Sequence, residues 1–186
     1  MTLKQMKIRL AADLQTDSIV DGQGIRTVIW TQGCSHNCPH CHNPQTHDFN
    51  GGELVELDEV IEKIKNLSGQ DGITFSGGDP MFQPKQCSIL ATEVHKLNMN
   101  VWAYTGFTFE ELIKSNNKDI LEFLTNIDVL IDGKFEIDKK SMDLEFRGSS
   151  NQRIIDIPKS LENHKVVLFD LKKQKNNTQK KEAIYI

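Results

Sequence analysis

The chain has 186 residues, 38% of them hydrophobic and 26% charged, with a formal net charge of −4. This length falls short of the roughly 200 to 250 residues of a closed eight-stranded α/β barrel, and a net-acidic surface is not the one expected of a nucleic-acid-binding protein. Because no apolar run approaches the ~20 residues of a membrane span either, we expect one cytoplasmic domain with no nucleic-acid or membrane partner.

Strand-like and helix-like segments alternate along the chain, which predicts a parallel sheet with crossover helices. Short apolar runs predict strands at residues 25–31, 72–75, 99–104, 127–131, 153–157 and 165–169. Apolar residues at helical spacing predict helices at residues 57–67, 84–97, 108–113 and 120–124. The fold class is therefore α/β, in a single domain that covers residues 1–170.

Helix-end signals support these boundaries. Asp58 is a candidate N-cap for the first helix, and Pro84 suits the first turn of the second. Thr108 and Glu111 form a capping-box pattern at the start of the third. The second helix is expected to bury one apolar face, formed by Cys87, Leu90, Ala91, Val94 and Leu97.

The end of the chain has a different composition. Residues 171–183 hold five Lys and one Glu with almost no apolar side chain. A segment of this kind cannot bury enough apolar surface to order itself. We therefore expect residues 171–186 to be a solvated, mobile tail.

Three of the four cysteines lie within eight residues, directly after the predicted strand 25–31. The segment reads Cys34-Ser35-His36-Asn37-Cys38-Pro39-His40-Cys41. The carboxyl ends of strands are where α/β sheets bind ligands, and thiolates at these spacings can hold three irons of a 4Fe-4S cluster. The fourth iron would then be open to a substrate.

The same residues also allow a zinc site. Cys34, Cys38 and Cys41 together with His42 would make a tetrahedral Cys3His set, and the spacing alone does not separate the two metals. The remaining cysteine, Cys87, falls on the apolar face of its predicted helix, so we expect it in the core.

Two further segments follow strand ends. Gly77-Gly78-Asp79-Pro80 lets the backbone approach a ligand, because glycine has no Cβ, and Asp79 could add charge; a plain strand-to-helix turn has the same composition. Asp132-Gly133-Lys134 follows the strand 127–131, where its side chains could point over the sheet edge toward a substrate or form a solvated surface turn. Asp21-Gly22 could be a simple hairpin turn.

The cysteine segment followed by Gly77-Gly78-Asp79-Pro80 resembles the two main motifs of radical S-adenosylmethionine enzymes, in the same order. Within that superfamily, further segments resemble the activating proteins of anaerobic ribonucleoside-triphosphate reductases. These are residues 21–26 (DGQGIR), 41–44 (CHNP), 131–135 (IDGKF) and 147–153 (RGSSNQR). The resemblance covers about residues 15–157 and implies a partial (β/α) barrel of the radical S-adenosylmethionine type.

This resemblance implies an enzyme that cleaves S-adenosylmethionine reductively at a 4Fe-4S cluster held by Cys34, Cys38 and Cys41. The resulting 5′-deoxyadenosyl radical would take a hydrogen atom from one glycine of the large reductase subunit. A reduced flavodoxin or a ferredoxin-type protein would supply the electron. The residues that the resemblance places around S-adenosylmethionine are His40, at a position that is often aromatic, and Gly77, Gly78, Asp79, Asp132 and Lys134.

Three alternatives stay open from the sequence. The first is another radical S-adenosylmethionine enzyme, either a pyruvate formate-lyase-type activase or a 7-carboxy-7-deazaguanine synthase. The second is a zinc-binding module without catalysis, and the third is an electron carrier. The short chain and residues 147–153 argue against the pyruvate formate-lyase activase by resemblance, and the lack of an evident fourth cluster ligand argues against the carrier.

Overall fold

The computed structural model of the chain describes residues 6–172, whose strands form one mixed sheet. Its centre is parallel, with β3 (Arg26–Thr31), β5 (Gly72–Gly77), β6 (Asn100–Tyr104) and β7 (Val129–Asp132) side by side in that order. Antiparallel strands flank this centre, namely β1 (Lys7–Leu10), β2 (Gln15–Ser18), β4 (Glu53–Glu56) and β8 (Arg153–Asp156). The predicted α/β fold with parallel central strands is confirmed.

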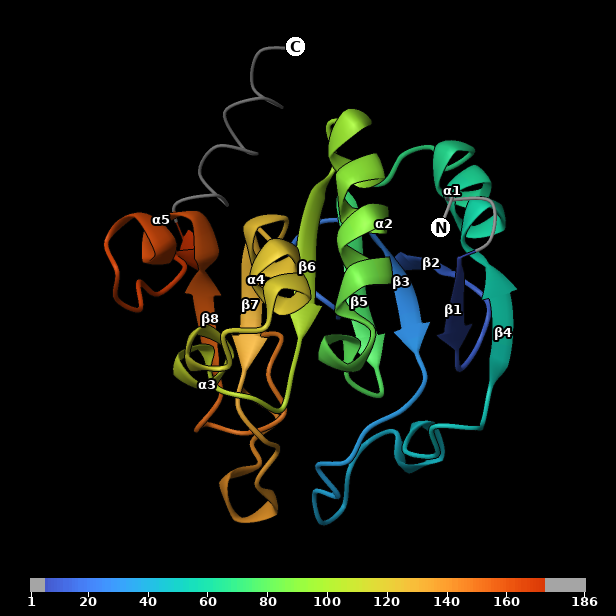
Figure 1. Cartoon of the computed structure of the whole chain (residues 1–186). Coiled ribbons are helices and arrows are strands. Elements are labelled where there is room, and N and C mark those ends of the chain that lie inside the picture. Colours follow the sequence, from blue (N-terminus) through green and yellow to red (C-terminus); the bar gives the residue numbers. More distant parts are fainter. Residues whose placement is uncertain (1–5, 173–186) are drawn as a thin grey trace, which may run out of the picture.

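The helices pack on one face of the sheet, where α2 and α4 are in front of the central strands (Figure 1). They are α1 (Leu57–Lys65), α2 (Pro84–Lys96), α3 (Phe109–Lys114), α4 (Lys118–Thr125) and α5 (Ile157–Glu162). Side chains from all five helices share one buried core with alternate residues of the strands, such as Phe75, Val101 and Leu130. The opposite face carries a smaller cluster around Trp102 and Ile131.

Some of the predicted helix ends are confirmed and others are wrong. Pro84 occupies the first turn of α2, and Thr108 and Glu111 form the capping box of α3, as the sequence predicts. Asp58 is not the N-cap of α1, because the helix begins at Leu57 and its N-cap is Glu56, whose side chain makes no capping hydrogen bond. Leu97 is 39% exposed rather than buried, because α2 ends at Lys96 and Leu97 is its C-cap.

Other predicted elements need correction at the ends of the chain. Residues 165–169 form no strand, and a single bridge between Ile155 and Leu168 joins them to β8. The strands β1, β2 and β4 are not among the predicted elements, because each is only four residues long; β1 does alternate polar and apolar residues, whereas β2 has no apolar residue. Of the predicted tail, residues 173–186 lie outside the described part of the chain.

Two long segments leave the sheet at the same end (Figure 1). One follows β3, contains the cysteines and the short 3-10 helix η2 (Pro44–Thr46), and leads to β4. The other joins β7 to β8 and contains η4 (Ile137–Lys139). Both emerge at the carboxyl edge of the parallel strands, the edge at which α/β sheets place their ligands. Within residues 6–172 no helix is both long and apolar enough to cross a bilayer.

Candidate functional site

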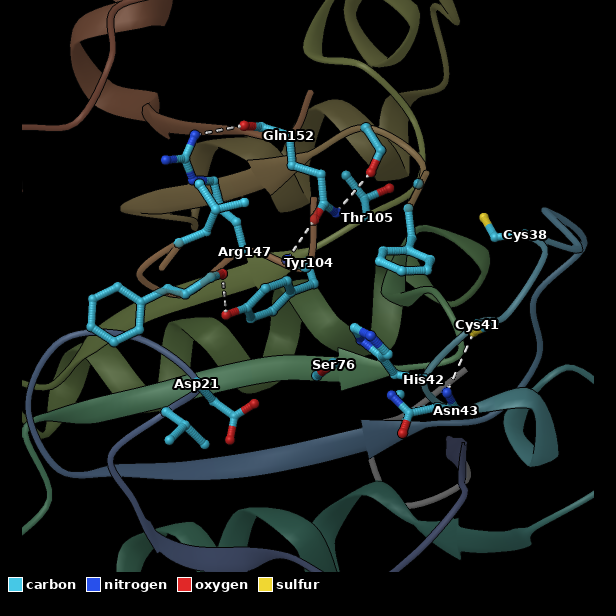
Figure 2. A pocket seen from close by; sticks show the side chains of 18 of the residues that line it. Asp21, Cys38, Cys41, His42, Asn43, Ser76, Tyr104, Thr105, Arg147 and Gln152 are labelled. Atoms are coloured by element: carbon cyan, nitrogen blue, oxygen red, sulfur yellow. Dashed lines mark hydrogen bonds between the residues drawn. The ribbon is translucent and has the colours of Figure 1, made fainter. Parts of the chain in front are cut away.

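A cavity of about 770 Å³ opens at the carboxyl edge of the parallel strands, on the sheet face opposite to the helices α1 to α5 (Figure 2). Its floor includes Trp30 of β3, Ser76 of β5 and Tyr104 of β6. Their side chains are on this face of the sheet, because neighbouring residues of a strand point to opposite faces. Cys38 and Cys41 are at one end of the cavity, and Arg147 and Gln152 are toward the other. The cavity is therefore lined by residues of both long segments that leave the sheet.

All three clustered cysteines line this cavity and carry free thiols. Backbone hydrogen bonds from Gly33 to Thr46 and from Cys34 to His47 hold the start of the segment against η2. Asn37 and His40 have left-handed backbone angles, with φ of 49° and 57°, so the chain between the cysteines turns sharply twice. These turns bring Cys34, Cys38 and Cys41 to the same wall.

Burial shapes the chemistry of these thiols. It raises the pKa of Cys34 to about 11 and also raises the pKa of Cys38. A backbone N–H of His36 opposes this effect at Cys34, a backbone N–H of Phe135 opposes it at Cys38, and the Asn43 N–H lies 3.4 Å from Cys41 Sγ. Each sulfur therefore has an N–H group beside it, which suits a thiolate that is bound to iron and keeps negative charge.

The arrangement fits a cluster with three protein ligands. Within residues 6–172, no three His, Cys, Asp or Glu side chains converge closely enough to share one metal ion. A cubane cluster does not require such convergence, since each thiolate binds a different iron. His42, the fourth ligand of the zinc alternative, packs its ring against Phe135 at 4.6 Å between centroids.

The turn after β5 lies directly against the cysteine segment. The Gly78 N–H donates to Thr31 O, and the Asp79 N–H donates to Gly33 O. A Cβ on Gly77 would lie 2.4 Å from Thr31 O, and one on Gly78 would lie 2.5 Å from Gly33 O. The sequence predicted close approach to a ligand; the structure shows that these glycines are required for close approach to the protein backbone, while both also line the cavity.

The acidic residues predicted near S-adenosylmethionine are buried within the protein. Asp79 is fully buried, and its carboxylate accepts hydrogen bonds from several protein donors. Asp132 is 1% exposed and accepts from the Phe109 N–H and the Arg153 guanidinium. Neither carboxylate is among the groups that line the cavity.

His40 and Lys134 are both exposed, and neither lines the cavity. Lys134 is next to two residues that do line it, Gly133 and Phe135. Its charge also favours the ionised form of Cys38, against the larger effect of burial that raises the pKa of that thiol. The segment after β7 thus meets the cysteines through Phe135 and Lys134 rather than through Asp132.

The structure gives residues 147–153 a defined role that the sequence did not reveal. The Gln152 side chain accepts from the Gly148 and Ser149 N–H groups and donates to Gly133 O. Arg147 donates to Gln152 O (Figure 2). This motif therefore fastens the end of the β7–β8 segment to its beginning.

The motif at residues 21–26 lies in the connection between β2 and β3, which is a hairpin connection with Asp21 on the cavity wall. Arg26 is fully buried and donates to Thr74, Gln23 and Asn100, with its guanidinium 5.2 Å from the Trp102 ring centroid. Desolvation lowers its pKa to about 10. Arg26 holds the amino ends of the central strands together.

The chain matches a known family model and has a weak likeness to a solved structure. The family model described as a 4Fe-4S single cluster domain matches residues 20–155. A crystal structure of QueE from Escherichia coli has 14% sequence identity to this chain and a TM-score of 0.47, covering 57% of this chain and 56% of that one.

The anaerobic ribonucleoside-triphosphate reductase-activating protein of Pasteurella multocida is 36% identical over 148 residues, which cover 73% of this chain and 90% of that protein. The proteins of the same name from Enterobacteria phage T4 and Escherichia coli K12 are 35% and 34% identical, covering 73% and 72% of this chain and 86% and 90% of theirs. The chain belongs to this family of activating proteins.

Membership of the activating-protein family decides between the two metals. The 4Fe-4S family model spans Cys34, Cys38 and Cys41. The cofactor is therefore a 4Fe-4S cluster and not zinc, and the prediction of an iron–sulfur enzyme is confirmed.

Proposed function

We propose that this protein activates an anaerobic ribonucleoside-triphosphate reductase by generating a glycyl radical on its large subunit. The observation that carries the proposal is that one cavity holds three free cysteines beside two glycines whose backbone is open to it, at the carboxyl edge of a parallel sheet. The relatives are named as activating proteins of that reductase.

Cys34, Cys38 and Cys41 would bind three irons of the cluster and leave the fourth open. When bound, the cluster and S-adenosylmethionine together supply a 5′-deoxyadenosyl radical after one-electron reduction. The side chains of this chain need to perform little acid–base chemistry, because a cofactor of this kind supplies the reaction and the protein supplies orientation and exclusion of water.

The backbone of Gly77 and Gly78 is the part of the turn after β5 that lines the cavity, and we assign it to the methionine end of S-adenosylmethionine. Backbone carbonyls can accept hydrogen bonds from the methionine ammonium without a side chain in between. His40 and Lys134 could reach a bound ligand only from the rim, because both are exposed outside the cavity lining.

The mouth of the cavity has features of a protein-contacting surface. Ile19 and Val20 are each 71% exposed and Met142 is 89% exposed, and all three line the cavity from two different segments. Exposed apolar side chains grouped around a cavity mark a place where another molecule binds. The proposed partner is the glycine-bearing loop of the reductase, and a reduced flavodoxin or ferredoxin-type protein would deliver the electron.

The test uses anaerobically reconstituted protein with S-adenosylmethionine, a reductant and the anaerobic reductase. A glycyl-radical doublet should appear by electron paramagnetic resonance when all four are present, and Cys34→Ala, Cys38→Ala or Cys41→Ala should abolish it. Cys87→Ala is the matched control, because Cys87 is fully buried in the helix-side core.

The opposing outcome is equally specific. If the protein cleaves S-adenosylmethionine, leaves the reductase without a radical and converts a deazapurine precursor instead, the activase assignment is wrong. Stoichiometric zinc without iron in protein isolated anaerobically would overturn the cluster itself.

A further inference from the structure

The cysteine segment carries a histidine whose contacts the proposed function does not explain. His36 Nε2 lies 2.7 Å from Asp79 Oδ2, and the two side chains are 7% and 1% exposed. Because an ionised carboxylate can only accept hydrogen bonds, the His36 Nε2–H must be the donor. A charge-assisted hydrogen bond therefore links the span between Cys34 and Cys38 to the turn after β5.

The Asp79 carboxylate is bound by protein donors, is fully buried and does not line the cavity. Its Oδ2 atom also accepts from the Thr105 hydroxyl and the Gly106 N–H, both at 2.9 Å, and its Oδ1 atom accepts from the Met81 N–H at 2.9 Å. Three of the four donors, His36 among them, are therefore on Oδ2 and one is on Oδ1, which leaves one of the roughly four lone-pair positions of the carboxylate without a donor from residues 6–172. Because the carboxylate is buried outside the cavity lining, the methionine ammonium of S-adenosylmethionine would reach that position only if the turn rearranged.

The imidazole of His36 occupies a fitted socket. Its edge meets the Phe107 ring with 4.5 Å between centroids, and the Phe82 ring is at 6.0 Å. A Cβ on Gly106 would lie 2.4 Å from His36 Cδ2, and the three atoms nearest to it all belong to His36. Glycine is therefore the only residue type at position 106 that leaves room for the ring in this place.

We propose that His36 and Asp79 are a positioning pair, in which Asp79 acts on the cofactors through His36 and does not bind S-adenosylmethionine directly. Cys34 is already fixed to the protein by its backbone bond to His47, whereas Cys38 follows the left-handed turn at Asn37. The His36 side chain anchors the middle of the span between them. The identity of the cofactors rests on the proposed function; the positioning role does not.

The first test measures amide hydrogen exchange in the cysteine segment of protein without iron. Gly106→Ala should push the His36 ring out of its socket and accelerate amide hydrogen exchange over residues 34–38 about tenfold, the effect of losing one hydrogen bond to a charged group. Far-UV circular dichroism checks that the variant is folded. Unchanged exchange in a folded Gly106→Ala variant would overturn the proposal.

A matched set of variants separates loss of the His36 contact from a general loss of structure. His36→Gln keeps an N–H donor near the position of Nε2 and should exchange close to the wild-type rate, whereas His36→Ala should exchange as fast as Gly106→Ala. The double variant with His36→Ala and Gly106→Ala should exchange no faster than either single variant, because the new Cβ at position 106 then has no imidazole ring to displace. Additive effects would mean that Gly106 acts on something other than His36.

The second test asks whether Asp79 touches the ligand, using S-adenosylmethionine titrated into the reconstituted protein. His36→Ala and Asp79→Asn should weaken binding by similar factors, and the double variant should bind no more weakly than either one. A further loss of affinity when Asp79→Asn is added to His36→Ala would show that Asp79 does not act through His36 alone and would overturn the proposal. The hydrogen-exchange test needs neither iron nor reductase, so its failure is distinguishable from failure of the proposed function.

Discussion

At the scale of single residues, the two glycines at and directly after the end of β5 show how closely the turn that follows β5 packs against the cysteine segment. Gly77 has a left-handed φ of 101° and contacts Thr31, while Gly78 contacts the backbone of Gly33 next to Cys34. Both positions require glycine, because a Cβ at either one would overlap the backbone of residues 31–33, which lead into the cysteine segment. A substitution here therefore changes the cluster site before it changes any contact with a ligand.

Gly78→Ala should therefore reduce cluster binding. The new Cβ would lie 2.5 Å from Gly33 O, and no flexible side chain can move aside to relieve the contact. We expect lower iron content after reconstitution and a loss of about 1 to 3 kcal/mol in the free energy of unfolding, measured by denaturant titration. Gly69→Ala is the control: no atom lies within 4 Å of the position that its Cβ would take, so only its left-handed backbone is strained and iron content should be unchanged.

Asp132 shows a second role that residue type alone could not predict. Its carboxylate and that of Glu110 share the Arg153 guanidinium, which joins the end of β7 to the start of β8 and to α3. The hydrogen bonds that Arg153 donates to Asp132 and Glu110 raise its pKa above its already high value. The pair at Glu110 is the exposed part of this network, with 48% of that side chain accessible.

The Glu110 interaction predicts a pH dependence with a definite sign. The hydrogen bond from Arg153 lowers the pKa of Glu110 below its ordinary 4.5, so the stabilisation is fully present above about pH 4.5 and is lost as the pH falls through the lower, folded-state pKa. Glu110→Gln should reduce the free energy of unfolding at pH 7 by about 0.2 to 1 kcal/mol, as expected for an exposed pair. The difference from the wild type should shrink below pH 4.5; a constant difference down to acid pH would contradict it.

The sequence predicted where Asp79 and Asp132 lie in the fold, but not which groups their carboxylates would contact. Asp79 lies after β5 and Asp132 is the last residue of β7, so both are at the carboxyl edge, but the carboxylate of each is bound by protein donors. That choice depends on Thr105, Gly106, Phe109 and Arg153, which are brought near only by tertiary packing. The cysteines differ, because their spacing along one short segment is enough to place them together.

At the scale of elements, the β7–β8 segment is held by side chains at its own end. Gln152 makes three hydrogen bonds to its backbone, to Gly148, Ser149 and Gly133. The Tyr104 hydroxyl adds one to Phe146 O at 2.8 Å, from the floor of the cavity. Since Phe135 of this segment lies beside Cys38 and His42, the fastening of the segment also fixes one wall of the cluster site.

Gln152→Leu should loosen that wall. The substitution removes both acceptor contacts and the donor contact, so hydrogen exchange at Gly148 and Ser149 should accelerate at least tenfold while exchange in α2 stays unchanged. Gln152→Glu keeps the two acceptor contacts and should have a smaller effect. Equal exchange in Gln152→Leu and wild type would show that other contacts hold the segment.

The elements that the sequence predicted are those with a strong local signal. The capping box of α3 and Pro84 at the start of α2 are encoded within one turn of chain. Residues 165–169 have an apolar pattern but make only one bridge to β8, because a strand also needs a partner along its length. The antiparallel strands β1 and β4 are only four residues each and are stabilised by pairing with each other, and so short a segment predicts no partner.

At the scale of the whole molecule, the sheet separates stability from chemistry. The main core fills the face covered by helices, with fully buried side chains such as Phe75, Leu90 and Phe123. The cavity with the cysteines is on the other side, at one edge of the sheet. The domain therefore has a core whose packing does not depend on the cluster.

Removal of iron by chelation under anaerobic conditions should consequently leave the fold intact. The far-UV circular dichroism of the apoprotein should match that of the loaded protein, because all five helices pack in the core away from the cysteines. The thermal midpoint should still fall, since a cofactor that binds only the native state stabilises it by mass action. Hydrogen exchange should increase over residues 33–47 and remain slow in β5 and α2. Loss of the helical signal on chelation would contradict this, because it would mean that the cluster is needed for folding, as metal is in a zinc finger.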